Sequence, residues 1–284
     1  MSADYLRRRL LKAGVGAAAL GALPGVGVIS FATAAGGRAG MATAFRATTH
    51  SMAWLGVETG IFKRLGLNAT FEKFTPGGPE IPTGLQRGEF EFGQTGVNTR
   101  LTVEKAGATA KYVGLGNFQN IYKALAAGDI DAGVMQIHQR FPGQRQYGWN
   151  AFDVVSLEIP SAFITTRKLI ASDRDMVLKV VQGIVETIHF FKTQRDAAVL
   201  LLQRFLQIDD RNAVEDLHAF YVPLFPAVPR VDLGEDGIKL LRDSFSRKFP
   251  AAAQLQESDI VDSSFIDQLE NSGFIQRLYG NVKL

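Results

Sequence analysis

The sequence predicts an α/β protein of two lobes, with a truncated second lobe and a helical C-terminal part. Three observations predict this class. Strand-like and helix-like segments alternate after the N-terminal leader. A short motif recurs 40 residues further along the chain, and the last third carries apolar residues at helical spacing. With 46% hydrophobic and 21% charged residues, the composition is that of a globular protein.

Residues 1–34 are predicted to be an export signal peptide. A basic segment, Arg7-Arg-Arg-Leu-Leu-Lys12, precedes an uncharged stretch rich in glycine and alanine, which ends in the cleavable small-x-small pattern Ala32-Thr33-Ala34. The paired arginines resemble a twin-arginine signal, although Leu6 stands where that class usually has Ser or Thr. The general secretory route and an uncleaved membrane anchor therefore stay open. We expect cleavage after Ala34 and a soluble periplasmic product.

Charge and cysteine content exclude several classes. The basic leader accounts for the whole net charge of +3, so the rest of the chain is neutral and lacks the basic surface that nucleic-acid binding needs. The chain has no cysteine, which excludes disulfides, thiolate metal sites, iron–sulfur clusters and a lipoprotein anchor.

The first lobe is expected to span residues 35–116. Its segments alternate as in parallel βαβ units, with Gly66 ending the first helix and a Pro-Gly-Gly-Pro turn preceding the second. The expected elements are a strand at Phe45–His50, a helix at Met52–Leu65, a strand at Asn68–Phe74, a helix ending at Arg87 and a strand at Phe90–Gly93.

An internal repeat predicts the second lobe, residues 117–166. Leu85–Gly93 matches Leu125–Gly133 in residue type at each position, and both read as a helix, a glycine cap and a strand. The alternative is chance similarity of glycine-containing turns. From Gly116 to Gly133 there is room for one strand and one helix only, roughly 30 positions less than the first copy occupies. The second lobe is therefore expected to lack its first strands.

The remaining chain is predicted to return to the first lobe and then become helical. Phe141–Asn150 reads as a loop, and Val154–Ile159 and Phe163–Thr166 read as strands of a return crossover, interrupted at Pro160-Ser161. Residues 167–284 are expected to form helices packing on the lobes, the first capped by Ser172-x-x-Asp175. Their apolar stripes lie at Met176–Phe191, Ala198–Phe205, Val214–Tyr221 and Ile238–Phe245, and a last helix is expected at Asp262–Asn271, ended by Gly273.

The order of these motifs resembles the periplasmic substrate-binding proteins of ABC importers for nitrate, sulfonates, taurine and thiamine precursors. The resemblance rests on the export signal, the Gly77-Gly78 turn, Ala106-Gly-Ala108, and three longer segments: Trp54–Leu67, the two repeat copies, and Phe265–Tyr279. It implies a two-lobed periplasmic-binding-protein-like fold of type II, with a small-molecule ligand held between the lobes and delivered to an inner-membrane ABC permease.

Candidate ligand-binding residues follow strands, because ligands of open α/β sheets bind at the carboxyl ends of the strands. Hydroxyl and amide side chains can hydrogen-bond an anion, glycines admit its approach, and an indole can stack on it. The alternative is that the polar residues only cap helices and that the tryptophan is core. The candidates are Ser51, Trp54, Gly78, Thr95, Gly96, Asn98 and, from the second lobe, Gln136, with Ser161 as a further possibility.

No catalytic or metal-ligating motif accompanies them. The four histidines, His50, His138, His189 and His218, form no zinc-binding spacing, and no nucleophile elbow or phosphate loop occurs. Acidic pairs such as Glu89/Glu91 are expected to be solvated. We therefore expect a monomeric, cofactor-free solute-binding protein, and not an enzyme. The alternatives are a non-binding or sensing relative of that family and an enzyme like those that form the thiamine pyrimidine.

Overall fold

The computed structural model describes residues 38–44, 46–75, 80–96, 118–133, 135, 137–150, 161–247 and 250–280. The chain divides into two units, Met1–Ala34 and Ala35–Leu284, and the first lies outside the described residues, as does the predicted cleavage site. In the part of the chain that is described, no helix combines the length and the apolar character needed to cross a membrane.

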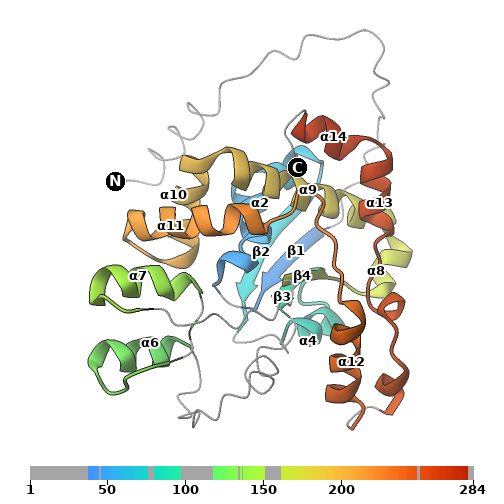
Figure 1. The fold of residues 1–284 in the computed structure, drawn as a ribbon. Helices are drawn as coiled ribbons and strands as arrows, with labels where there is room; N and C mark the ends of the chain where they lie inside the picture. The colour runs from blue at the N-terminus through green and yellow to red at the C-terminus, as the bar shows by residue number, and fades with distance from the viewer. Residues whose placement is uncertain are drawn as a thin grey trace, which may run out of the picture. The chain divides into compact units, whose positions relative to one another are not determined.

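A four-stranded mixed sheet forms the centre of the described structure (Figure 1). Its order is β2 (Asn68–Phe74), β1 (Arg38–Thr43), β3 (Phe92–Gly96) and β4 (Ser161–Ile164). β1 runs parallel to β2 and β3, whereas β4 runs antiparallel to β3, with Gly93 opposite Ile164. The chain thus returns to this sheet, but over Ser161–Ile164 and not over the predicted Phe163–Thr166, so Ser161 belongs to the strand and does not interrupt it. The strand predicted at Val154–Ile159 lies outside the described residues.

The first strand lies earlier than the sequence predicted. The prediction of a strand over residues 45–50 is wrong, because β1 ends at Thr43 and Thr48–His50 form the 3-10 helix η1. β1 is made of small residues and is buried along almost its whole length. A Cβ on Gly40 would lie 2.8 Å from Glu91 Oε2, so packing, not β-branched content, selects this strand.

The helix predicted from Met52 to Leu65 is broken in two. α2 (Met52–Glu58) and α3 (Ile61–Arg64) meet at Gly60, which has a φ of 71°. A left-handed residue cannot continue a right-handed helix, so the chain turns there. The helix predicted to end at Arg87 is present as α4 (Glu80–Arg87).

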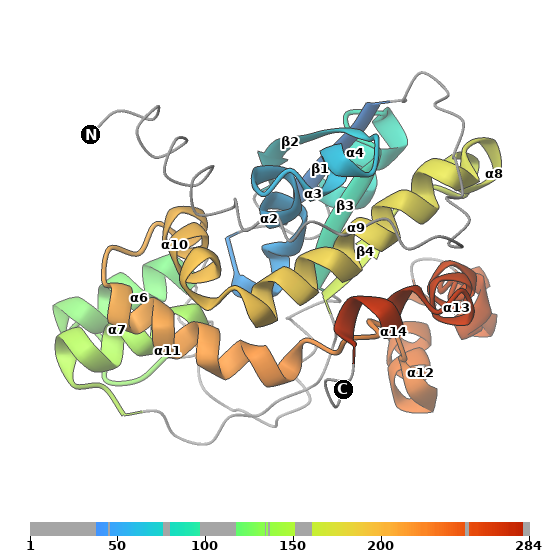
Figure 2. The ribbon, with the colours of Figure 1, turned by 90° about the horizontal axis from the view of Figure 1, so that it is seen from above.

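Helices cover the two faces of the sheet. Ala39 and Met41 on one face pack with the apolar side of α9 (Arg174–Thr193), which Figure 2 shows running alongside the strands. Ala42 on the other face packs with α4 through Ile81 and Leu85. This alternation follows from the period of two along a strand.

The C-terminal half is helical, as predicted. The cap of α9 differs from the prediction, because Asp173 and not Ser172 accepts the Met176 amide, at 3.0 Å. The remaining helices are α8 (Arg167–Ser172), α10 (Arg195–Leu206), α11 (Arg211–Tyr221), η2 (Val222–Leu224), α12 (Gly234–Phe245), η3 (Pro250–Gln254), η4 (Glu257–Asp259), α13 (Ser264–Asn271) and α14 (Phe274–Tyr279).

The second repeat copy keeps the helix and the glycine turn but not the strand. α6 (Phe118–Ala127) ends at Gly128, whose φ of 76° matches the 69° of Gly88. Equivalent backbone hydrogen bonds close the two turns. The Glu89 amide donates to the Gly84 carbonyl at 3.0 Å, and the Asp129 amide donates to the Ala124 carbonyl at 2.9 Å. The predicted strand ending at Gly133 is wrong, because residues 130–133 are in no sheet.

The loop predicted over Phe141–Asn150 is also wrong over most of its length, because α7 spans Ile137–Tyr147. Pro142 and Gly143 lie inside this helix, against their intrinsic preference. Trp149 folds back so closely that a Cβ on Gly143 would lie 2.1 Å from its ring. The ring stacks on Tyr147 at 4.9 Å and meets Tyr122 of α6 edge-on at 5.1 Å. Aromatic packing therefore overrides the local propensity.

Candidate functional site

The chain that leaves the carboxyl end of β1 is lined with buried polar residues. Thr43, Thr48 and Ser51 are completely buried, and His50 is 4% exposed. Polar groups are seldom buried so densely unless they hydrogen-bond or serve a ligand. We therefore define the carboxyl-edge cluster as residues 43, 44 and 46–51, together with Thr75, which follows β2, and Gln94 and Thr95 of β3.

Gln94 fixes this cluster to the sheet. Its Nε2 donates to the Thr49 carbonyl at 2.7 Å, and its Oε1 accepts the Ala53 amide at 3.4 Å. The Ala44 amide donates to the Gln94 carbonyl at 3.0 Å, while the Thr75 amide donates to the Thr43 carbonyl at 2.8 Å. The loop after β1 is thus held by both neighbouring strands.

Two hydroxyls in the cluster are buried without a hydrogen-bond partner among the described residues, Thr43 Oγ1 and Thr48 Oγ1. Leaving a buried hydroxyl unmatched costs about 1–3 kcal/mol, so such groups are candidates for a ligand contact. The sequence reasoning missed both residues, because it placed the first strand over the loop that contains Thr48. A predicted strand ending at Thr43 would have placed both residues at the carboxyl end of a strand and so among the candidates.

Two uncharged histidines lie at the same edge. Burial, together with the neighbouring His138, lowers the pKa of His50 to about 4. Burial also lowers the pKa of His138 to about 4, and its Nδ1 is shielded, with no partner in the described part of the chain. His138 is in the first turn of α7 and contributes to lowering the pKa of His50, so this helix approaches the carboxyl-edge cluster.

Trp54 lies on a stack of aromatic and cationic side chains. Its ring is 5.5 Å from Phe205, which is 5.5 Å from Phe74. Arg46 covers Phe74 at 3.8 Å and donates to the Phe205 carbonyl at 2.7 Å, and Arg204 lies 5.4 Å from the indole centroid. Half-buried Trp54 thus joins α2 to α10.

The other predicted residues are distributed as follows. Ser51 is fully buried and its hydroxyl donates to the Thr48 carbonyl at 2.7 Å, so it makes no side-chain cap. The strand predicted at Phe90–Gly93 is instead β3, which runs to Gly96, so the prediction that Thr95 and Gly96 lie in a loop after it is wrong. Thr95 is half-buried, and Gly96 ends the strand opposite Ser161. Gly78, Asn98 and Gln136 lie outside the described residues.

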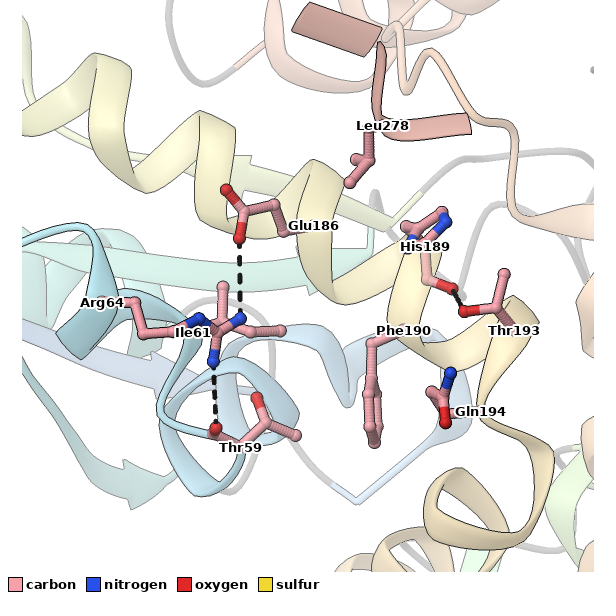
Figure 3. Close-up of a pocket in the computed structure, with 9 residues that line it drawn as sticks. All are labelled: Thr59, Ile61, Arg64, Glu186, His189, Phe190, Thr193, Gln194 and Leu278. Carbon is pink, nitrogen blue, oxygen red and sulfur yellow. Dashed lines mark hydrogen bonds and ion pairs between the residues drawn. The ribbon is translucent and has the colours of Figure 1, made fainter. Parts of the chain in front are cut away.

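Two surface pockets lie elsewhere. One, of about 290 Å³, is between α3, α9 and α14 (Figure 3). The other, of about 410 Å³, lies beside η4 and includes Arg230 and Glu257. Neither contains a residue of the carboxyl-edge cluster. Within the described ranges, no three His, Asp or Glu side chains are grouped so as to hold a metal ion.

Comparison with known proteins identifies the fold. No family model matches the sequence, and no curated protein matches it. A protein of Bordetella bronchiseptica RB50 superposes with a TM-score of 0.58 at 12% identity, covering 83% of this chain and 97% of its own.

Two binding proteins superpose similarly. The alkanesulfonate-binding protein SsuA of Xanthomonas axonopodis pv. citri, bound to MOPS, has a TM-score of 0.54 at 14% identity and covers 80% of this chain and 97% of its own. The periplasmic aliphatic sulphonate binding protein SsuA of Escherichia coli has a TM-score of 0.52 at 13% identity. The match covers 74% of this chain and 87% of that protein's chain. The chain therefore has an α/β periplasmic-binding-protein-like fold.

Proposed function

We propose that this chain is the extracytoplasmic solute-binding component of an ABC importer, which captures a small organic anion and delivers it to a permease. The observation that carries the proposal is the pair of buried, unmatched hydroxyls of Thr43 and Thr48, at the strand ends where such folds bind ligands. The sulfonate-binding proteins with the same fold support it. The predicted leader supports export to the periplasm.

The chemistry of the carboxyl-edge cluster favours an acceptor-rich ligand. Hydroxyl groups donate hydrogen bonds to oxyanions, and each of the two uncharged imidazoles has one N–H that can donate as well. In this proposal Thr43 and Thr48 join the residues predicted from the sequence: Ser51, Trp54, Gly78, Thr95, Gly96, Asn98 and Gln136. Trp54 acts there by supporting the loop through its contact with Phe205.

A thermal-shift screen of the purified protein with MOPS, taurine, nitrate, pyrimidines and small aromatic acids tests the proposal. A ligand that binds only the native state raises the melting temperature as RT ln(1 + [L]/Kd). We expect at least one anion to do so without being chemically changed.

Mass spectrometry of the exported protein should show an N-terminus at Ala35.

Thr48→Val separates ligand binding from folding. Because the Thr48 hydroxyl has no described partner, the variant should be as stable as the parent or more stable. Its affinity for the anion found in the screen should fall by about 1.5–3 kcal/mol, the value of a hydrogen bond to a charged group. The matched control is Thr70→Val, the same substitution at an exposed position of β2, which should leave the affinity unchanged. Unchanged affinity of Thr48→Val would refute the site assignment.

A second candidate function is that of a non-binding relative that senses or interacts. The observation that favours it is the unpaired segment at residues 130–133, where a complete second lobe would supply a strand. The same screen discriminates the two, because a non-binding relative shows no melting shift with any compound.

A further inference from the structure

The pocket between α3, α9 and α14 combines opposite charges with an apolar wall (Figure 3). Arg64 and Glu186 face each other at one side, and Leu278 of α14 approaches from the other. Ile61 and Phe190 complete the apolar lining. The pocket shares no residue with the carboxyl-edge cluster, so binding here would be independent of the proposed function.

The ion pair in this pocket is loose. Glu186 Oε2 is 3.7 Å from Arg64 Nη2, whereas charge-assisted hydrogen bonds are about 2.7–2.9 Å long. The other oxygen of Glu186 accepts from Gln182 at 3.0 Å, and Arg64 Nη1 reaches the Thr59 carbonyl only at 3.5 Å. Both charges therefore retain hydrogen-bonding capacity toward the pocket.

The pocket also contains an uncharged imidazole. His189 is half-buried, and burial lowers its pKa, so the ring is uncharged at neutral pH. Tyr279 meets it edge-on, with centroids 4.8 Å apart and an interplanar angle of 89°. Tyr279 has a buried hydroxyl without a partner in the described residues, so its ring is held by packing and in turn supports His189.

We propose that this pocket binds a small zwitterion, an α-amino acid with an apolar side chain. The ammonium group would bind Glu186, with the uncharged imidazole of His189 as a further acceptor, and the carboxylate would bind Arg64. A plain amine would be repelled by Arg64 and a plain carboxylate by Glu186, whereas a zwitterion satisfies both. The volume of about 290 Å³ suits a molecule of that size, with its side chain against Ile61, Phe190 and Leu278.

Calorimetric titration with three related compounds tests this proposal. L-leucine carries both charges, leucinamide only the positive one and N-acetyl-leucine only the negative one. We expect leucine to bind, and each single-charge analogue to bind at least about tenfold more weakly, because each leaves one charged group of the pocket unmatched. Equal binding of the three compounds, or no binding of leucine, would overturn the proposal.

Variants locate the site. Glu186→Gln keeps the shape of the side chain and should weaken leucine binding about tenfold or more, as should Arg64→Gln. Lys63→Gln, which removes an exposed charge next to Arg64 but outside the pocket lining, is the control and should bind as the parent does. Thr48→Val should also leave leucine binding unchanged. Leucine binding that persists in Glu186→Gln but is lost in Thr48→Val would assign it to the carboxyl-edge cluster and refute this pocket.

Discussion

Three polar side chains are buried in a way that reduces the stability of the fold: those of Thr43, Thr48 and His50. The two hydroxyls are buried without a described partner, and the imidazole is almost completely desolvated. Such groups reduce stability unless something compensates for them. Their concentration in one loop, next to the strand ends, is why the proposed site is placed there and not in either of the open surface pockets.

The burial of His50 predicts an acid-sensitive fold. Its pKa falls from 6.5 to about 4 in the folded protein, so the unfolded chain binds more protons between these values. The free energy of unfolding is therefore unaffected by His50 above pH 6.5 and decreases as the pH falls toward 4. The loss is of the order of 3 kcal/mol for this residue. Urea unfolding at pH 7, 5.5 and 4.5 measures it.

His50→Gln provides the comparison for that experiment. The variant lacks the titrating group, so its stability should change less between pH 7 and 4.5 than that of the parent. His138, whose pKa is lowered in the same way, should leave a residual dependence in the variant. Parallel pH profiles of parent and variant would contradict the assignment.

At the scale of elements, the two repeat copies share more than a turn. A Cβ on Gly93 would lie 2.2 Å from Ile81, and one on Gly133 would lie 2.4 Å from Ile121, the residue at the equivalent position of the other copy. Helix, glycine cap and glycine–isoleucine contact are therefore repeated, and only the strand pairing is missing. A strand needs a neighbour for its backbone groups, and the second copy has none among the described residues.

This difference predicts unequal effects of one substitution. Gly93→Ala places a methyl group inside a buried, paired strand and should cost about 1–3 kcal/mol. Gly133→Ala creates a similar contact in an exposed segment that can shift, so it should cost less than about 1 kcal/mol. Chemical unfolding of both variants measures the difference. Equal losses would mean that residues 130–133 are as firmly held as β3.

The sequence was informative where local signals decide the structure. The apolar stripes of α9, α10, α11 and α12 and the alternation of β2 predicted those elements, because periodicity reports burial directly. It failed at β1 and α7, where tertiary packing overrides propensity: Gly40 fits beside Glu91, and Trp149 covers Gly143. The site followed the same division. Ser51 follows η1 and lies in the carboxyl-edge cluster, whereas Thr95, expected in a loop, lies inside β3, and the error in β1 concealed Thr43 and Thr48. The role of these residues as ligand contacts stays a prediction.

At the scale of the whole chain, α7 packs on the C-terminal helix α11. Arg145 of α7 forms an ion pair with Asp216 of α11, and its Nε donates to that carboxylate at 3.0 Å. Phe141 and Phe220 make an edge-to-face contact at 6.1 Å between the same two helices. Exposed ion pairs contribute at most about 1 kcal/mol, so the apolar contact is the more important one. α11 thus supports a helix that has no sheet beneath it in the described structure.

Under the proposed function, this arrangement predicts how the protein responds to a bound anion. Hinged proteins close by moving one rigid lobe against the other, but here α7, in the segment predicted to form the second lobe, is held to α11 by an aromatic contact and an ion pair. We therefore expect a saturating anion to leave the radius of gyration unchanged in small-angle X-ray scattering. We also expect a modest affinity, because the described residues form one sheet only and supply no second sheet to cover the ligand. The Phe220→Ala variant, which frees α7, should bind more weakly still without unfolding. A ligand-induced decrease of about 1 Å or more in the radius of gyration would show that the short lobe closes after all.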